Sequence, residues 1–132
     1  MISDNDVIEL FKELGMRVEK GKGSYYFHVE VSPPIGNGPA VSIIRPSPNS
    51  KYYIITMLLE VDKSKMDRSM IRQINMELAK MNVEVYMIPP EQPSTIQVAK
   101  IVFSDDLNKN ELLNTVTLVK NASFLVYNIL QS

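Results

Sequence analysis

The sequence predicts an α+β fold, a single domain with a mainly antiparallel sheet packed with helices in the order α-β-β-β-α-β-β-α. Three observations lead to this class. Five segments alternate apolar and polar side chains or are rich in β-branched residues, three segments repeat apolar residues at helical spacing, and Pro- or Gly-rich turns separate them. A chain of 132 residues has the size of one domain, so we expect residues 1–132 to form one.

The first helix is predicted at the N-terminus. Ser3 is a suitable N-cap, and Asp4 and Asp6 place negative charge in the first turn, where the free amide groups favour it. The apolar residues at helical spacing are Val7, Leu10, Phe11 and Leu14. Gly15 is a suitable C-terminal stop.

Three strands are predicted next, over residues 25–31, 40–45 and 51–61. The first two flank the Gly-Asn-Gly sequence at 36–38. A phosphate-binding glycine loop leads directly into a helix, whereas here Pro39 and a β-branched segment follow, so we interpret these glycines as a hairpin loop. Both faces of residues 51–61 are apolar, which predicts a central strand or one whose second face is covered by a partner.

A second helix, a hairpin and a last helix complete the prediction. The Ser64–Asp67 segment has the pattern of a capping box, so we place the start of the second helix there and its end near Asn82. Residues 83–90 and 95–103 are the strands of an antiparallel hairpin. Asp105, Asp106 and Asn108 offer caps for the last helix.

Composition excludes several classes of function. Fourteen Lys and Arg balance fifteen Asp and Glu, so the net charge of −1 makes nucleic acid an unexpected partner. The chain has no cysteine, its N-terminus carries acids where a secretory signal carries basic residues, and no apolar stretch reaches the ~20 residues that span a membrane. We expect a cytoplasmic protein with no membrane partner.

His28 is the single histidine, and no sequence motif supplies the other groups of a catalytic triad or a metal shell. With Tyr26 and Glu30, which alternation places on the same strand face, it is a candidate ligand site. The favoured interpretation is a half-exposed strand histidine beside a carboxylate. We therefore predict no catalytic residue, no cofactor and no metal, and we interpret the paired acids at helix starts as caps.

The second helix offers two candidate surfaces. Its basic group, Lys63 to Arg72, is interleaved with acids and predicts a solvated face, with RNA binding as the weakest alternative. Eight methionines occur in the chain, and although core packing is their commoner role, the second helix has more apolar surface than one sheet face needs. The predicted dimer or partner interface comprises Met66, Met70, Ile74, Met81 and Met87.

The order of elements resembles that of the type III secretion chaperone-like fold, which bacterial YbjN-type domains share with an archaeal family of uncharacterised proteins. The matching stretches are DNDVIELFKELGMRVEK before GSYYFHVEV, KYYIITMLLEVDKSK before the second helix, and VEVYMIPP and TIQVAKIVFS before the last helix. The resemblance implies a small homodimer, joined through the second helix and adjacent strands, that binds extended segments of another protein. It implies no catalytic residues, and the archaeal branch is the nearest to this sequence.

Two hypotheses of different classes follow. The first is a non-catalytic protein-binding module, chaperone-like or adaptor-like, that acts as a homodimer. The alternative is an enzyme or small-ligand-binding protein with a site near His28, for which a polar pocket beside that residue is the discriminating observation.

Overall fold

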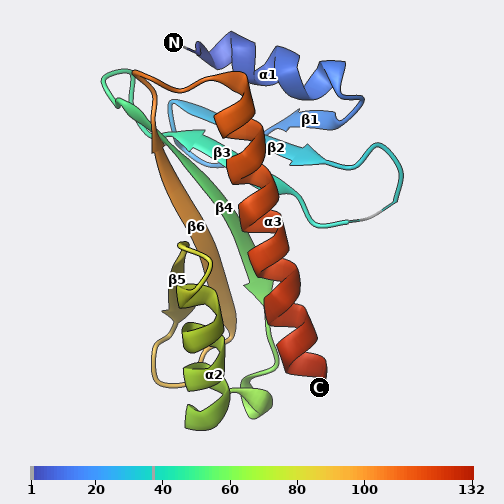
Figure 1. Ribbon diagram of the computed structural model, residues 1–132, viewed down its shortest axis with the longest axis vertical. Coiled ribbons are helices and arrows are strands. Elements are labelled where there is room, and N and C mark those ends of the chain that lie inside the picture. The colour runs from blue at the N-terminus through green and yellow to red at the C-terminus, as the bar shows by residue number, and fades with distance from the viewer. Residues whose placement is uncertain (1, 37) are drawn as a thin grey trace. The chain divides into compact units, whose positions relative to one another are not determined.

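A computed structural model describes residues 2–36 and 38–132 of the chain (Figure 1). The elements are α1 (Asp4–Glu13), β1 (Arg17–Lys20), β2 (Phe27–Ser32), β3 (Val41–Arg45), β4 (Tyr52–Glu60), the 3-10 helix η1 (Lys63–Lys65), α2 (Arg68–Ala79), β5 (Glu84–Ile88), β6 (Thr95–Phe103) and α3 (Lys109–Gln131). Over the described residues the strands form one six-stranded sheet in the order β1-β2-β3-β4-β6-β5. The α+β class is confirmed, with one strand, β1, added to the predicted order.

The chain divides into two compact units. Unit 1 comprises the chain up to Ile55 together with Ile101–Val116, and unit 2 comprises Thr56–Lys100 together with Thr117–Ser132. Strands β4 and β6 and helix α3 therefore contribute residues to both units. Each unit is described by itself below.

In unit 1, helix α1 begins at the predicted cap. The Ser3 hydroxyl accepts a hydrogen bond from the Asp6 amide, and the Asp6 carboxylate accepts one from the Ser3 amide, which completes a capping box. The helix buries Val7 and Phe11 against β1 and β2, beside which it lies in Figure 1. Gly15 follows the helix with a φ of 78°, the left-handed conformation that suits a C-terminal stop.

Strand β1 was not predicted, because its sequence RVEK holds one apolar residue in four. Its strand conformation depends on antiparallel pairing with β2, in which Val18 lies opposite Val31 and Lys20 opposite Val29. Strand β2 also pairs antiparallel with β3, and Gly36 in the connecting loop has a φ of 95°. The hairpin interpretation of the Gly-Asn-Gly sequence is thus confirmed, although Asn37 itself lies outside the described residues.

In unit 2, helix α2 begins later than predicted. Its N-cap is Asp67, whose carboxylate accepts a hydrogen bond from the Met70 amide at 2.8 Å. The predicted cap, Ser64, instead lies in η1, where Asp62 accepts from both its amide and its hydroxyl. An aspartate at the third position competes for the cap role itself, which is why the capping-box prediction was wrong.

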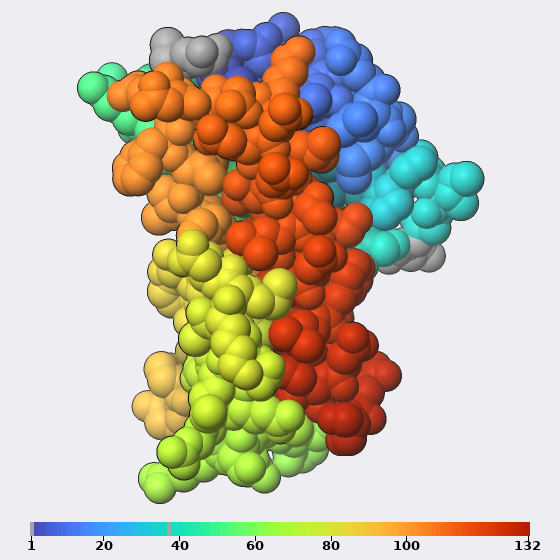
Figure 2. Space-filling view, viewed as in Figure 1, coloured from blue at the N-terminus to red at the C-terminus, as the bar shows by residue number. Residues whose placement is uncertain are grey.

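The core of unit 2 lies between one face of the sheet and the helices. Alternate residues of β4 and β6 point into it, and Figure 2 shows the side of unit 2 that α2 and the end of α3 cover. The buried side chains are Met57, Leu59, Met66, Ile74, Leu78, Ile96, Val98, Val119, Ala122, Val126 and Ile129. The hairpin of β5 and β6 is antiparallel as predicted.

Helix α3 begins after Asn108, whose side-chain oxygen accepts a hydrogen bond from the Glu111 amide at 2.8 Å. Of the three predicted caps, Asn108 is therefore the one that caps α3. Among the helices of the described chain, none is both long enough and apolar enough to cross a membrane.

Candidate functional site

The structure brings His28 and Glu30 together on β2. The His28 Nε2 atom lies 3.3 Å from Glu30 Oε1, and the histidine side chain is 12% exposed. The geometry is not that of a hydrogen bond, so within the described residues neither ring nitrogen has a hydrogen-bond partner. Glu30 instead accepts a hydrogen bond from the Ser42 hydroxyl at 2.7 Å. The favoured interpretation, a half-exposed strand histidine beside a carboxylate, is right about the carboxylate and wrong about the exposure, because the side chain is 12% exposed and both ring nitrogens are buried.

Tyr26, the third residue of the predicted ligand site, precedes β2 and is exposed. Its ring lies under the Arg45 guanidinium, with 4.9 Å from the carbon Cζ to the ring centroid. Tyr26 and His28 both contribute to the lining of a hollow of about 330 Å³ in unit 1. Its other lining residues are Ile8, Lys12, Val18, Glu19, Lys20, Phe27 and Val29. Most of the accessible surface of this hollow is apolar. His28 is therefore not beside the polar pocket that the ligand hypothesis requires.

A second cluster in unit 1 ties α1 to the sheet. The Arg45 guanidinium donates to both Asp4 oxygens at 2.9 and 2.5 Å, and the Tyr53 hydroxyl donates to Asp4 Oδ1 at 2.6 Å. Arg45 also donates to the carbonyls of Ser47 and Pro48. These three side chains line a hollow of about 650 Å³, but their polar groups are engaged with one another. The cluster therefore has the character of a structural anchor.

The electrostatics of this cluster follow from its contacts. Burial alone would raise the pKa of the Asp4 carboxyl, but the hydrogen bonds from Arg45 and Tyr53 outweigh burial and lower the pKa below its ordinary value. Burial and the hydrogen bond to Asp4 raise the pKa of Tyr53 well above its ordinary value. Asp4 is thus held as a carboxylate and Tyr53 as a neutral phenol.

The predicted interface on helix two divides between core and surface. Met66 and Ile74 are 2% and 0% exposed and belong to the core of unit 2. Met70, Met81 and Met87 are half-buried. Of these three, Met70 lies on α2, Met81 just after it and Met87 on β5, and an interface through them stays a prediction. Met76, at 59% exposure, is a large apolar side chain on the solvent side of α2.

The basic group around the start of α2 is exposed. Lys63 and Lys65 lie in η1, and Arg68 and Arg72 lie on the exposed side of α2. Among the described residues, no group of three His, Cys, Asp or Glu side chains could hold a metal ion.

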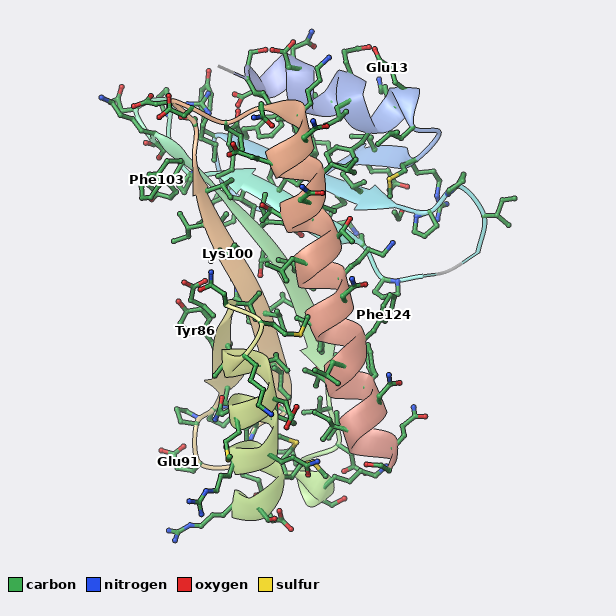
Figure 3. All side chains as sticks on the ribbon, in the orientation of Figure 1. Glu13, Tyr86, Glu91, Lys100, Phe103 and Phe124 are labelled. Atoms are coloured by element: carbon green, nitrogen blue, oxygen red, sulfur yellow. The ribbon has the colours of Figure 1, made fainter. Side chains whose placement is uncertain are left out.

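Unit 2 leaves one face of its sheet uncovered. On β4, Leu59 is fully buried whereas its neighbour Leu58 is 61% exposed, because successive side chains point to opposite faces. On β5, Tyr86 and Ile88 are 50% and 46% exposed, and Tyr86 projects away from α2 in Figure 3. We call this surface the open face of unit 2; alternation assigns to it Thr56, Leu58, Glu60, Glu84, Tyr86, Ile88, Thr95, Gln97 and Ala99. Thr56 and Ala99 are each only 4% exposed, so the accessible part of this face is formed by the other seven residues.

Cross-strand contacts fix the layout of the open face. In the β5–β6 register Tyr86 lies opposite Gln97, and the Gln97 amide donates to the Thr56 hydroxyl of β4 at 3.0 Å. Ile88 lies opposite Thr95, whose hydroxyl lies 3.5 Å from the Glu60 carboxylate. The large apolar side chains therefore stand on the two strands that flank β6, namely β4 and β5, on either side of the smaller or polar residues of β6.

Unit 1 carries exposed apolar residues on its own part of β6. Ile101 and Phe103, two residues apart and thus on one face, are 44% and 72% exposed. Phe103 projects outward in Figure 3. The sequence indicated an exposed apolar sheet face only at residues 51–61, the segment that forms β4, because both faces of that segment are apolar.

Comparisons with known proteins place this arrangement in a known fold. A crystal structure of an uncharacterized protein from Methanothermobacter thermautotrophicus matches with a TM-score of 0.82 and 21% identity, covering 98% of this chain and 97% of that one. The crystal structure of YbjN from E. coli matches with a TM-score of 0.58 and 13% identity, covering 98% and 90%. The chain thus has a YbjN-like fold, as the resemblance in the sequence implied.

The family follows from the sequence profile. Residues 3–130 match the family described as "Uncharacterized conserved protein (DUF2299)", and the chain belongs to that family. A search of curated proteins finds no match.

Proposed function

We propose that the protein is a non-catalytic, cytoplasmic protein-binding module, adaptor-like or chaperone-like, that acts as a homodimer. One observation carries the proposal, the open face of unit 2 with Leu58, Tyr86 and Ile88 exposed together. Several large apolar side chains exposed on one face of a sheet, among polar residues, are typical of surfaces that bind proteins. The YbjN-like fold is compatible with this role, although the YbjN structure itself carries the description "a putative transcription regulator".

The engaged carboxylates support the non-catalytic part of the proposal, as does the burial of both His28 ring nitrogens, which have no hydrogen-bond partner among the described residues. Asp4, Arg45 and Tyr53 bind one another, and the Glu30 carboxylate is engaged by Ser42. A catalytic acid or base must reach the reacting atom of a substrate.

The test of binding compares two matched variants. Leu58→Asp and Met76→Asp each place one negative charge on a side chain of unit 2 that is about 60% exposed, the first on the open face and the second on α2. Both tagged variants and the wild type would be recovered from lysate of the native host, and the co-eluting proteins would be quantified by mass spectrometry. We expect Leu58→Asp to lose a near-stoichiometric partner that Met76→Asp retains. Equal retention by both variants would contradict the proposal.

The homodimer is tested at α2. Met70 is half-buried, so Met70→Asp leaves the core of unit 2 in place, whereas a charge at the fully buried Ile74 would unfold it. Light scattering at matched concentrations should show half the wild-type mass for Met70→Asp. A folded Met70→Asp variant with the wild-type mass would refute the interface through α2.

A further inference from the structure

Acidic side chains, and no basic ones, accompany the apolar residues of the open face of unit 2. Glu60 ends β4 and Glu84 begins β5, and both are exposed. Of the nine residues on this face none is Lys or Arg. Glu91, in the turn that follows β5, is also exposed (Figure 3), but Lys63 lies beside that turn, where its carbonyl accepts a hydrogen bond from Gln92, so only Glu60 and Glu84 count for the face. The field at this surface therefore favours a cationic partner.

The two face carboxylates stand at opposite corners. Glu60 lies beside Thr95 at one end of β6, and Glu84 lies opposite Ala99 towards the other. Four residues of extended chain separate Thr95 from Ala99, which corresponds to about 13 Å. Because Glu60 is on β4 and Glu84 on β5, the two charges also lie on opposite sides of the β6 strip.

We propose that the open face of unit 2 binds an amphipathic helix of another protein, whose apolar stripe is flanked on both sides by Lys or Arg. The inference rests on the proposed function and specifies the partner's chemistry. Neighbouring strands are about 4.8 Å apart, so Leu58 on β4 and Tyr86 and Ile88 on β5 rise from strand axes about 10 Å apart, a span that the apolar stripe of one helix, about 10–12 Å across, can cover.

The binding geometry follows from these dimensions. The helix lies along β6, over the part-exposed Thr95 and Gln97, with its apolar stripe between Leu58 on one side and Tyr86 and Ile88 on the other. A rise of 1.5 Å per residue over about 13 Å places the two basic residues about nine positions apart, on opposite flanks of the stripe. The other face of this part of the sheet already carries helices, so the partner would complete a layer on each side.

The test uses two designed helical peptides with the same Leu and Ala stripe. One peptide carries Lys on both flanks and the other carries Glu at the same positions. Fluorescence anisotropy should show the Lys peptide binding about tenfold more tightly, which is the combined effect of two exposed ion pairs. The preference should shrink as salt is raised from about 0.05 M to about 0.5 M.

Two double variants locate the charge effect. Glu60→Gln with Glu84→Gln should abolish the preference for Lys. Gln73→Lys with Asn75→Lys raises the net charge by the same amount, at exposed positions of α2. This double variant should keep most of the preference for the Lys peptide. Loss of preference in both double variants would mean that net charge alone is responsible, and would overturn the inference.

A third variant separates this inference from the proposed function. Leu58→Ser removes an apolar side chain of the face without changing its charge, and should weaken binding of both peptides. If Leu58→Ser weakens both peptides but the wild type binds them equally, the basic partner is refuted and the protein-binding face stands. If the wild type binds neither peptide, the helical partner is refuted, and the lysate comparison still tests the proposed function.

Discussion

Replacement of Asp4 by asparagine tests the anchor between α1 and the sheet of unit 1. The Asp4 carboxylate accepts two hydrogen bonds from Arg45 and one from Tyr53, and the side chains of Asp4 and Arg45 are only 24% and 16% exposed. The asparagine side chain would keep one acceptor oxygen and lose the charge, leaving Arg45 partly desolvated without its counter-ion.

The magnitude follows from the bonds lost. A hydrogen bond to a charged group contributes about 1.5–3 kcal/mol, and at least one of the three is removed outright. Because Asp4 and Arg45 are partly exposed, water can replace some of the lost hydrogen bonding. The expected loss of stability therefore lies near the lower end of the range for breaking a desolvated ion pair. We expect Asp4→Asn to lower the free energy of unfolding by about 2 kcal/mol at pH 7.

The pH dependence identifies the carboxylate as the cause. The folded-state pKa of Asp4 is lowered, so the unfolded chain binds the proton more readily. The stabilisation is then fully present above the unfolded pKa of about 3.9 and is lost as the pH falls through the lower folded value. The advantage of the wild type over Asp4→Asn should therefore shrink below about pH 4.

Urea unfolding followed by circular dichroism measures both quantities, with Asp106→Asn as the control. Asp106 is exposed and lies before α3, so its replacement should change stability little. A difference between wild type and Asp4→Asn that stays constant down to pH 3 would refute the electrostatic reasoning. Equal stability at pH 7 would show that the anchor contributes nothing.

Two further predictions concern packing. A Cβ at Gly21 would fall on the ring of His28, so Gly21→Ala should destabilise the chain by about 1–3 kcal/mol. The control is Gly38→Ala, whose Cβ would meet only ordinary contact distances and should change stability little. Urea unfolding measures both variants. Leu78 is fully buried, so Leu78→Ala should cost about 2–5 kcal/mol, and a loss under about 1 kcal/mol would show that α2 is not packed as described.

The sequence predicted the parts of the fold that local patterns specify. Alternation and β-branched composition located β2 to β6, and because β4 lies between β3 and β6, a central strand, the first of the two predicted alternatives, is confirmed. Strand β1 escaped prediction because Val18 is its one apolar residue and its pairing with β2 determines its conformation. Secondary structure that depends on a neighbour leaves no periodic signal of its own.

The anchor in unit 1 could not be predicted for a related reason. Asp4 is 41 residues from Arg45 and 49 from Tyr53, and no local pattern connects positions so far apart. Sequence reasoning assigned Asp4 to the first turn of a helix, which is correct but incomplete. The methionines in and next to α2 show the opposite difficulty, because apolar residues at helical spacing can belong to the core or to the surface. Only their burial in the folded chain distinguishes Met66, at 2% exposure, from Met76, at 59%.

The open face of unit 2 is best understood from what the unit needs to fold. Met57 and Leu59 bury one face of β4 completely, so Leu58 between them adds little to that core. An exposed apolar row on a sheet favours aggregation, and a sequence that served folding alone would place polar residues there, as it does at Thr95 and Gln97 on the adjacent strand. Apolar residues retained on both strands that flank β6, with carboxylates at opposite corners, are therefore better explained by a bound partner than by the stability of the unit itself.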